Sequence, residues 1–447
     1  MLETITQEEL KDLILNGKPV EIKAVIEHTH PVDILDILHS DEDSSKEILE
    51  HLPNEVIGDI LEEEDDEELI YEWLNLFSKA KQRQILDEVS TSVITDLIGE
   101  LEDDEKDNIL QLLEADDKED VEKLLKYDPE TAGGIMSTEY IDIHAKNTVK
   151  ETLEFLQSNT EEDATYYLYV VDKENILKGV VSLRDIVTSP FYTPMMDITN
   201  TNVISVLYNE DQEEVAKKFS KYSFILMPVV DEQGHLLGII DFDDVMDVIE
   251  EETTEDINLL GGVGSEERVD STLKESFRNR IPWLVVNLLT AIMAASVVNV
   301  FSGTIEKVVM LATINPIITG MGGNAGTQTL TIVVRGLSLG EISKEDALPI
   351  LLKEIGVGFL NGCTIGILVS VGCWLFAGNP WFGVVAGIAM LCNMVIATFA
   401  GYFVPVILDK FHIDPALASG VFVTTCTDMF GFFVFLGLAT VFIQYLV

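Results

Sequence analysis

Asp428 is the side chain with the clearest chemical potential, because it lies inside the long apolar stretch 415–447, in the sequence TTCTDMFG at 424–431. A charged Asp at the centre of a membrane helix costs roughly 2.5–3.5 kcal/mol, and a structural Asp there normally has a basic partner at the same depth. None of the apolar stretches of this chain contains a Lys or Arg. A permeating cation is therefore the partner that we expect, and Asp428 is its predicted ligand.

A second polar group interrupts the apolar stretch 308–334, where residues 315–328 read NPIITGMGGNAGTQ. Proline removes a backbone donor, and glycines permit bends or close helix contact. Irregular backbone at membrane depth is tolerated only beside protein or a water-filled cavity. Asn324 and Gln328 are one helical turn apart, which favours a pore wall, with tight helix packing through small residues as the alternative. The predicted pore lining is Asn315, Gly323, Asn324, Gln328, Thr424 and Asp428.

Five apolar stretches must position these residues, at 281–303, 308–334, 355–377, 381–408 and 415–447. Each is long enough to cross a bilayer, which takes about 20 helical residues. Basic residues gather before the first stretch, between the second and third, and between the fourth and fifth, and the positive-inside rule places these segments in the cytosol. We expect five transmembrane helices, a cytosolic N-terminal part and an external C-terminus, in the plasma (bacterial inner) membrane.

The charge of the chain is concentrated in its first half. Of the net charge of −50, residues 1–256 carry −47, from 66 acidic and 19 basic side chains. Such a field repels nucleic acid and anionic lipid surfaces and attracts cations. All four cysteines lie in the apolar last third, and no HExxH, GxSxG or Walker-type motif occurs. The composition therefore argues against nucleic-acid binding and against the common enzyme classes.

The first half divides into two segments. Residues 1–127 repeat short amphipathic phrases, HPVDILDILHSD, LPNEVIGDILEEE and STSVITDLIGELEDDE, which predict an all-α superhelical domain. Residues 168–187 and 227–246 then repeat one pattern of strand, turn, strand and helix at a spacing of 59 residues. This duplication resembles the tandem CBS (Bateman) module. We expect CBS copies at 128–190 and 191–254, and a connecting (plug) helix over 255–280 that leads into the membrane domain at 281–447.

Taken together, these segments resemble the MgtE family of magnesium channels and transporters over essentially the whole chain. The resemblance is carried by YDPETAGGIMS, TEDINLLGG, GMGGNAGTQ, KEIGVGFLNG, DPALAS and TDMFG. It implies a homodimeric, multidomain membrane protein, with an all-α N domain, an α+β CBS module, a plug helix and five transmembrane helices. It also implies that Asp428 holds hydrated magnesium at the dimer axis and that Asp414 of DPALAS is a further ion contact.

The resemblance further implies cytosolic ligands for regulatory magnesium. They fall on Asp59, Asp96, Gly133 (through its carbonyl), Asp211, Glu213, Asp247, Glu252, Glu255 and Asp256. Ser92 and Ser223 occupy two further ligand positions, which leaves the number of regulatory sites open. CBS pairs often bind adenine nucleotides through the last Asp of the repeated phrase. Ser182 and Asp185 keep that pattern, whereas Asp241 replaces the usual hydroxyl before Asp244, so ATP at this module is left open.

The expected function is magnesium-selective transport, closed by cytosolic magnesium that bridges the acidic domains and the plug helix. Magnesium prefers hard oxygen ligands and sheds water reluctantly, which suits a pore of carboxylate, amide and carbonyl oxygens. The alternatives are a transporter of cobalt, manganese or calcium, a membrane-anchored nucleotide sensor that moves no ion, and a membrane enzyme. The expected partners are a second copy of the chain, divalent cations and membrane lipid.

Overall fold

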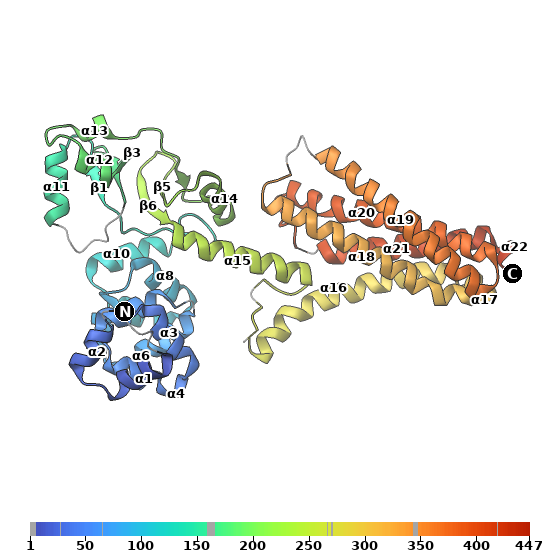
Figure 1. Cartoon of the computed structure of the whole chain (residues 1–447), viewed down its shortest axis with the longest axis horizontal. Helices are drawn as coiled ribbons and strands as arrows, with labels where there is room; N and C mark the ends of the chain where they lie inside the picture. Colours follow the sequence, from blue (N-terminus) through green and yellow to red (C-terminus); the bar gives the residue numbers. More distant parts are fainter. Residues whose placement is uncertain are drawn as a thin grey trace. The chain divides into compact units, whose positions relative to one another are not determined.

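The computed structural model describes residues 6–26, 28–64, 66–158, 166–265, 267–269, 271–342, 347–417 and 419–447. The chain forms two compact units, Met1–Val248 and Ile249–Val447, and most of their elements are labelled in Figure 1. Each unit has hydrophobic cores of its own. The first unit holds the helical domain and the two predicted CBS copies, and the second holds the apolar helices.

The helical domain is built from short amphipathic helices that bury one face each. Side chains such as Ile34, Ile57 and Ile98 from the three repeated phrases are fully buried in one core. Polar caps set the ends: Thr6 forms a capping box with Glu9. The helices in the described residues are α1 (Gln7–Asn16), α2 (Pro19–Ile26), α3 (Pro31–Ser40), α4 (Glu42–His51), α5 (Asn54–Glu62), α6 (Glu67–Asn75), α7 (Lys79–Leu86), α8 (Thr91–Glu100), α9 (Asp103–Leu110) and α10 (Ala115–Leu124). The predicted all-α N domain is confirmed.

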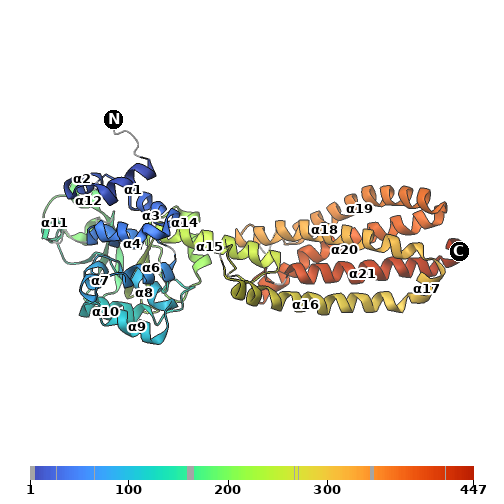
Figure 2. The same cartoon turned by 90° about the horizontal axis from the view of Figure 1, so that it is seen from below.

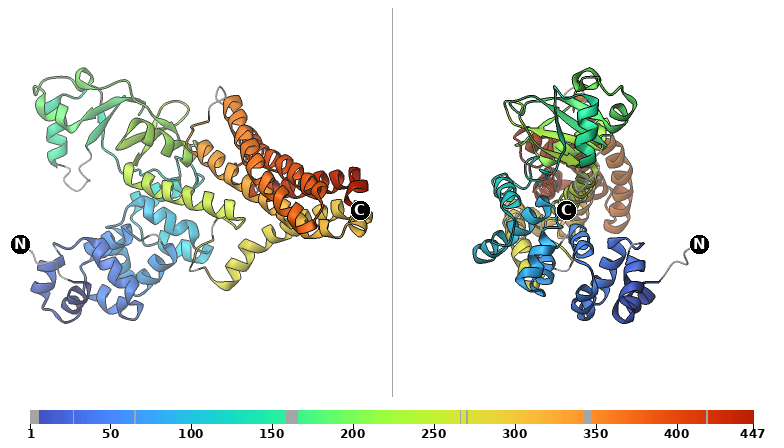
Figure 3. Two further views of the ribbon diagram at one scale, coloured as in Figure 1. Left: turned by 45° about the vertical axis from the view of Figure 1, so that its right-hand side comes forward. Right: turned by 90° about the vertical axis from the view of Figure 1, so that its left-hand side faces the viewer.

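The CBS module contains two three-stranded sheets with the same topology, and Figure 3 gives two views of them. They are β1 (Asp142–His144), β2 (Tyr167–Val171) and β3 (Leu177–Ser182), and β4 (Val206–Leu207), β5 (Leu226–Val230) and β6 (Leu236–Asp241). In each sheet the first pair is parallel and the second antiparallel. The pairs Val170↔Gly179 and Val229↔Gly238 stand just before the same register shift. The accompanying helices are α11 (Val149–Ser158), α12 (Leu183–Thr188), α13 (Met195–Ile198) and α14 (Gln212–Tyr222). The structure therefore confirms the predicted duplication.

The connection to the membrane domain differs from the prediction. The expected helix over 255–280 is wrong: its first residues end α15 (Phe242–Gly261), and its last residues begin α16 (Leu273–Val300). Gly262 stops α15 because it adopts a positive φ of 72°, which favours glycine. Thr272 starts α16 through a capping box with Glu275. The described residues between the two helices, 262–265, 267–269 and 271–272, are not helical.

The second unit contains long helices that run side by side (Figure 2). They are α16, α18 (Met310–Ser338), α19 (Ala347–Ala377), α20 (Pro380–Lys410) and α21 (Ser419–Val441), with the short α17 (Ser302–Lys307) and α22 (Ile443–Leu446). In the described residues, four helices are long and apolar enough to span a membrane: α16, α19, α20 and residues 420–441 of α21. Helix α18 has the length, but its amides and glycines lower its hydropathy. Its role as a fifth span stays a prediction.

Glycines allow these helices to approach closely. A Cβ on Gly366 of α19 would lie 2.8 Å from the carbonyl oxygen of Gly387 on α20. A Cβ on Gly401 of α20 would lie 2.5 Å from the carbonyl oxygen of Gly326 on α18. Both gaps are too small for a side chain, so the backbones themselves are in contact, as is common between membrane helices. Helix α20 is thereby held against both α19 and α18.

Candidate ion pathway

Helix α18 presents two different faces. Asn315, Ile318 and Gly322 lie on the face that is buried within the unit, whereas Asn324 and Gln328 are exposed on the other face. The structure therefore brings Asn324 and Gln328 together but separates Asn315 from them. Only 8% of Asn315 is exposed, and its Oδ1 has no hydrogen-bond partner among the described residues.

Helix α21 crosses α18 at small residues and carries the predicted ion ligand. The position of a Cβ on Gly323 lies 3.7 Å from Cγ2 of Thr424, and that of a Cβ on Gly326 lies 2.6 Å from Cγ1 of Val423. Thr424 is exposed, with its hydroxyl donating to the carbonyl of Gly420. One turn further along α21, Asp428 is half-buried. No ion pair or hydrogen bond reaches its carboxylate from the described residues, which leaves it available to a cation.

Two buried polar residues near this crossing were not predicted. Asn393 of α20 is fully buried, and its Nδ2 donates to the carbonyl oxygen of Ile318 at 2.8 Å. Glu354 of α19 is 3% exposed and accepts from the hydroxyl of Thr329 at 3.3 Å, with the Lys353 ammonium 3.0 Å away. Sequence offered a signal for both: Asn393 is the single amide in 381–408, and Glu354 belongs to the motif KEIGVGFLNG.

The loop between α20 and α21 brings Asp414 close to the end of α15. Partial desolvation, and then the negative charge of Asp256, raise the pKa of Asp414. The Asp414 carboxylate caps its own loop by accepting from the backbone N–H of Ala416 at 2.7 Å. Asp256 accepts from the hydroxyl of Ser338, at the end of α18, at 2.9 Å. Two acidic side chains predicted as ion ligands are thus neighbours at this end of α18 and α21.

Apolar contacts fix the same end of α15. Leu259 is buried in a cluster with Leu330 and Val334 of α18, Ala416 of the loop and Val423 of α21. This cluster joins the helix that leaves the CBS module to both helices of the predicted pore. Glu252 and Glu255 lie on the same part of α15 and are half-buried.

The acidic ligands predicted in the first unit lie on separate elements. Asp59 is exposed on α5, Asp96 on α8 and Asp247 on α15. Asp211 is the N-cap of α14, where it accepts from the backbone N–H of Glu213 at 2.9 Å. Among the residues that the structure describes, no group of three or more His, Cys, Asp or Glu side chains is close enough to hold a metal ion.

Other predicted regulatory positions have visible structural roles. Glu213 pairs with Lys217 at 3.1 Å. Gly133 is buried where a Cβ would lie 2.8 Å from both the Tyr127 ring and the carbonyl oxygen of Tyr208, so this position needs glycine for packing. Ser223, which ends α14, has a left-handed backbone with φ of 54°. The Ser92 hydroxyl lies 3.1 Å from that of Ser90.

The two CBS copies differ at the predicted nucleotide residues. In the first copy, the Ser182 hydroxyl caps α12 and donates to the Asp185 carboxylate at 2.6 Å. In the second copy, Asp241 accepts from the N–H of Asp243 at 2.7 Å, and Asp244 accepts from the N–H of Asp241 at 3.2 Å. Burial, followed by the charge of Asp241, raises the pKa of Asp244 to about 7. A pair of carboxylates thus replaces the hydroxyl–carboxylate pair of the first copy.

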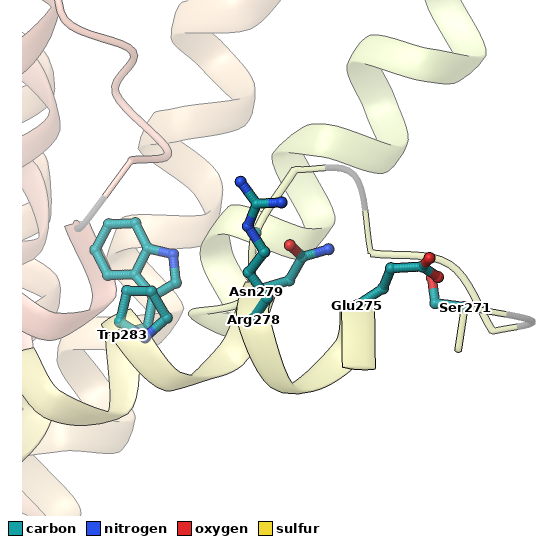
Figure 4. A pocket seen from close by; sticks show the side chains of 7 residues that line it. Ser271, Glu275, Arg278, Asn279 and Trp283 are labelled. Carbon is teal, nitrogen blue, oxygen red and sulfur yellow. The ribbon is translucent and has the colours of Figure 1, made fainter. Parts of the chain in front are cut away.

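A surface pocket of about 580 Å³ lies beside the first turns of α16. Figure 4 shows Ser271 and Glu275 together at one end of it and Trp283 at the other, with Arg278 and Asn279 between them. The Glu275 carboxylate caps the helix by accepting from the backbone N–H of Thr272 at 2.8 Å. The pocket is separate from the predicted ion ligands.

The half-buried Asp428 carboxylate inside an apolar helix, in a chain that also carries a tandem CBS module, is typical of a multi-pass membrane transporter of cations with a cytosolic N-terminal part. Residues 315–438 match the family MgtE, described as a divalent cation transporter. Residues 29–130 match the MgtE intracellular N domain, and residues 132–191 and 195–251 match the CBS domain.

Relatives of known function agree with these matches. The chain is 31% identical to the magnesium transporter MgtE of Bacillus subtilis over 451 residues, covering 99% of this chain and 100% of the relative. It is 38% identical to the magnesium transporter MgtE of Enterococcus faecalis over 324 residues, covering 72% and 71%. The chain therefore belongs to the MgtE family of magnesium transporters.

Solved structures resemble the cytosolic part. A crystal structure of the cytosolic domain of the Mg²⁺ channel MgtE in complex with ATP matches with a TM-score of 0.51 and 33% identity, covering 54% of this chain and 100% of that one. The soluble part of a magnesium transporter matches with a TM-score of 0.52 and 33% identity, covering 55% and 99%.

Proposed function

We propose that this chain conducts hydrated magnesium along a path lined by α18 and α21, with Asp428 as the ligand that attracts the ion. The observation that carries the proposal is the half-buried Asp428 carboxylate, which no described cation or donor neutralises. A carboxylate in this position is costly unless a cation is present. Hydrated magnesium suits the site, because the ion keeps several waters and is usually bound through one or two carboxylates.

The path requires a second copy of the chain. One Asp per chain provides little charge for selecting a divalent ion, whereas two related by a two-fold axis double the charge at one point. The exposed amide face of α18, with Asn324, Thr327 and Gln328, gives each copy a polar surface to contribute. In this arrangement α18 is the fifth transmembrane helix, the C-terminus lies outside, and Gly323 and Thr424 lie beside Asp428.

Cytosolic magnesium closes the path. The predicted ligands Asp59, Asp96, Asp211, Glu213, Asp247, Glu252 and Glu255 repel one another at low magnesium, and bridging ions remove that repulsion. At the membrane end, the neighbouring Asp256 and Asp414 carboxylates would share an ion. The ion would also relieve the repulsion from Asp256 that, together with the larger effect of burial, raises the pKa of Asp414. Closure then reaches α18 and α21 through the Leu259 cluster.

ATP binding at the CBS module is a second part of the proposal. It is supported by the 33% identical cytosolic domain of an Mg²⁺ channel MgtE that was crystallised in complex with ATP. The Ser182–Asp185 pair of the first copy offers a hydroxyl and a carboxylate to a ribose. In the second copy, Asp241 adds a second carboxylate beside Asp244, which makes that copy less suitable for binding an anionic nucleotide. ATP titration of the purified full chain tests this: Asp185→Ala should weaken binding more than Asp244→Asn.

The transport proposal is tested by ion flux in liposomes that contain a magnesium indicator. Asp428→Ala and Asp428→Asn should both abolish magnesium uptake and still give a folded protein on size exclusion. Asp409→Asn is the matched control, since it removes an exposed carboxylate at the end of α20 and should leave flux unchanged. Uptake by the Asp428→Asn variant at the wild-type rate would overturn the pore assignment. Cobalt and manganese uptake in the same liposomes ranks the alternative ions.

A further inference from the structure

The Asn393 side chain lies where three membrane helices meet. A Cβ added to Gly322 of α18 would lie 2.1 Å from Asn393 Nδ2, and one added to Gly431 of α21 would lie 3.0 Å from Asn393 Oδ1. The amide of α20 therefore occupies the space that side chains on both other helices would need. At Gly322 and Gly431, α18 and α21 have no side chains of their own to fill the space between the two helices.

One half of the Asn393 amide is satisfied and the other half is not. Its Nδ2 donates to the carbonyl oxygen of Ile318 at 2.8 Å, which fixes the orientation of the amide. Its Oδ1 is fully buried and has no hydrogen-bond partner among the described residues. Buried polar atoms almost always have a partner, and one that lacks it calls for an explanation. A leucine would fill the same space without this cost, so packing alone does not explain an amide.

The unpaired oxygen lies next to the predicted ion pathway. Gly431, which Oδ1 faces, follows Asp428 by three residues, so both lie on neighbouring parts of one face of α21. On the other side, Gly322 precedes Gly323, whose neighbour across the helix crossing is Thr424. Both α18 and α21 meet the amide at a glycine, so neither Gly322 nor Gly431 places a side chain between the amide oxygen and the pathway. A small separation of α18 and α21 would expose it to the pathway.

We propose that Asn393 Oδ1 is a specificity determinant that accepts a hydrogen bond from the water shell of the conducted ion, one helical turn beyond Asp428. The proposal rests on the proposed function and adds a second contact to it. Waters bound to magnesium are strong hydrogen-bond donors and leave the ion reluctantly. A neutral amide oxygen accepts from such a shell and does not trap the charge. It therefore favours ions that keep their waters over ions that shed them.

Asn393→Leu and Asn393→Asp separate this role from packing. Leucine removes both the donor and the acceptor at similar volume. A protonated aspartic acid still donates to the Ile318 carbonyl and keeps an acceptor oxygen. Thr398→Val is the matched control, because Thr398 is also buried on α20 but its hydroxyl donates to its own helix, at the carbonyl of Val395. Magnesium and calcium fluxes are measured for each full-length variant in the same liposomes, because calcium binds with more flexible coordination.

We expect Asn393→Leu to lower magnesium flux about tenfold, the loss of roughly one hydrogen bond to a charged group, and to lower calcium flux much less. The ratio of the two fluxes should stay near the wild-type value in Asn393→Asp and Thr398→Val. Equal losses for both ions in Asn393→Leu would mean that Asn393 only supports packing. Wild-type fluxes in Asn393→Leu would also overturn the proposal. If Asp428→Asn conducts like the wild type, the pathway itself is misassigned. This result distinguishes a failure of the proposed function from a failure of the Asn393 proposal.

Discussion

Gly322→Ala tests the helix junction around Asn393 and leaves the predicted ion ligand Asp428 in place. The added Cβ would lie 2.1 Å from Asn393 Nδ2 and 2.9 Å from its Cγ. Carbon and nitrogen atoms that are not bonded normally stay more than 3 Å apart, so the amide must move. That movement breaks the 2.8 Å hydrogen bond to the carbonyl of Ile318, because the same nitrogen is its donor.

The expected cost follows from three contributions. Overpacking a well-packed interior costs about 1–3 kcal/mol. The lost hydrogen bond adds about 0.5–1.5 kcal/mol. Against these two costs, replacing glycine by alanine inside a helix stabilises the helix by about 1 kcal/mol. We expect Gly322→Ala to lower the free energy of unfolding of the membrane domain by about 0.5–3.5 kcal/mol.

The assay is unfolding of the purified chain in mixed micelles, with rising denaturing detergent. Gly372→Ala is the control, because a Cβ at Gly372 of α19 would meet nothing within 4 Å, and it should be neutral or slightly stabilising. In an Asn393→Ala background the cost of Gly322→Ala should largely vanish, since the two residues are in contact and their effects are not additive. Equal stability of Gly322→Ala and Gly372→Ala would refute the close contact.

Three further predictions concern the cytosolic part and its link to the membrane. Neutralising Asp247, Glu255 and Asp256 together should leave flux in liposomes that no longer stops when internal magnesium rises, and closure at the wild-type concentration would contradict the gating proposal. Leu259→Ala should have a similar but weaker effect on closure, because truncating a buried leucine costs about 2–5 kcal/mol in the cluster that joins α15 to α18. Because burial raises the pKa of Asp244 to about 7, the folded state binds an extra proton between pH 4 and 7, so stability should fall as the pH rises through 7. Melting curves at pH 5.5 and 8 should show this fall in the wild type and a smaller one in Asp244→Asn.

Much of the fold could be predicted because it depends on local pattern. The spacing of the repeated CBS phrases appears directly as matching registers at Gly179 and Gly238. The apolar stretches form long helices, and α18 stays one helix although it contains Pro316 and several glycines, because a backbone at membrane depth must satisfy its own hydrogen bonds. The plug helix was mispredicted although its signals were local: Gly262 ends one helix, and Thr272 with Glu275 starts the next.

The pore lining was harder to predict, because composition does not say which way a helix faces. Asn315 and Asn324 are nine residues apart, or about two and a half turns, and so lie on opposite faces of α18. The helical period of 3.6 residues per turn is sufficient to predict that these two side chains lie on opposite faces. By contrast, the contacts of Asn393 and Glu354 could not be predicted, since each depends on which helix becomes its neighbour. The glycines at 322, 401 and 431 decide this by permitting close approach, and their partners are distant in sequence.

In the proposed gating, the contacts of α18 would carry a signal from the cytosol to the pathway. Asn393 of α20 holds the carbonyl of Ile318, and Glu354 of α19 holds the hydroxyl of Thr329, so two neighbouring helices bond to α18 from its buried side. Leu259 of α15 packs against the same helix at Leu330 and Val334, directly after Thr329. Because hydrogen bonds are directional, small shifts of α18 change them more than they change apolar packing. In the proposed closure, a displacement of α15 would therefore act directly on the helix that carries Asn324 and Gln328.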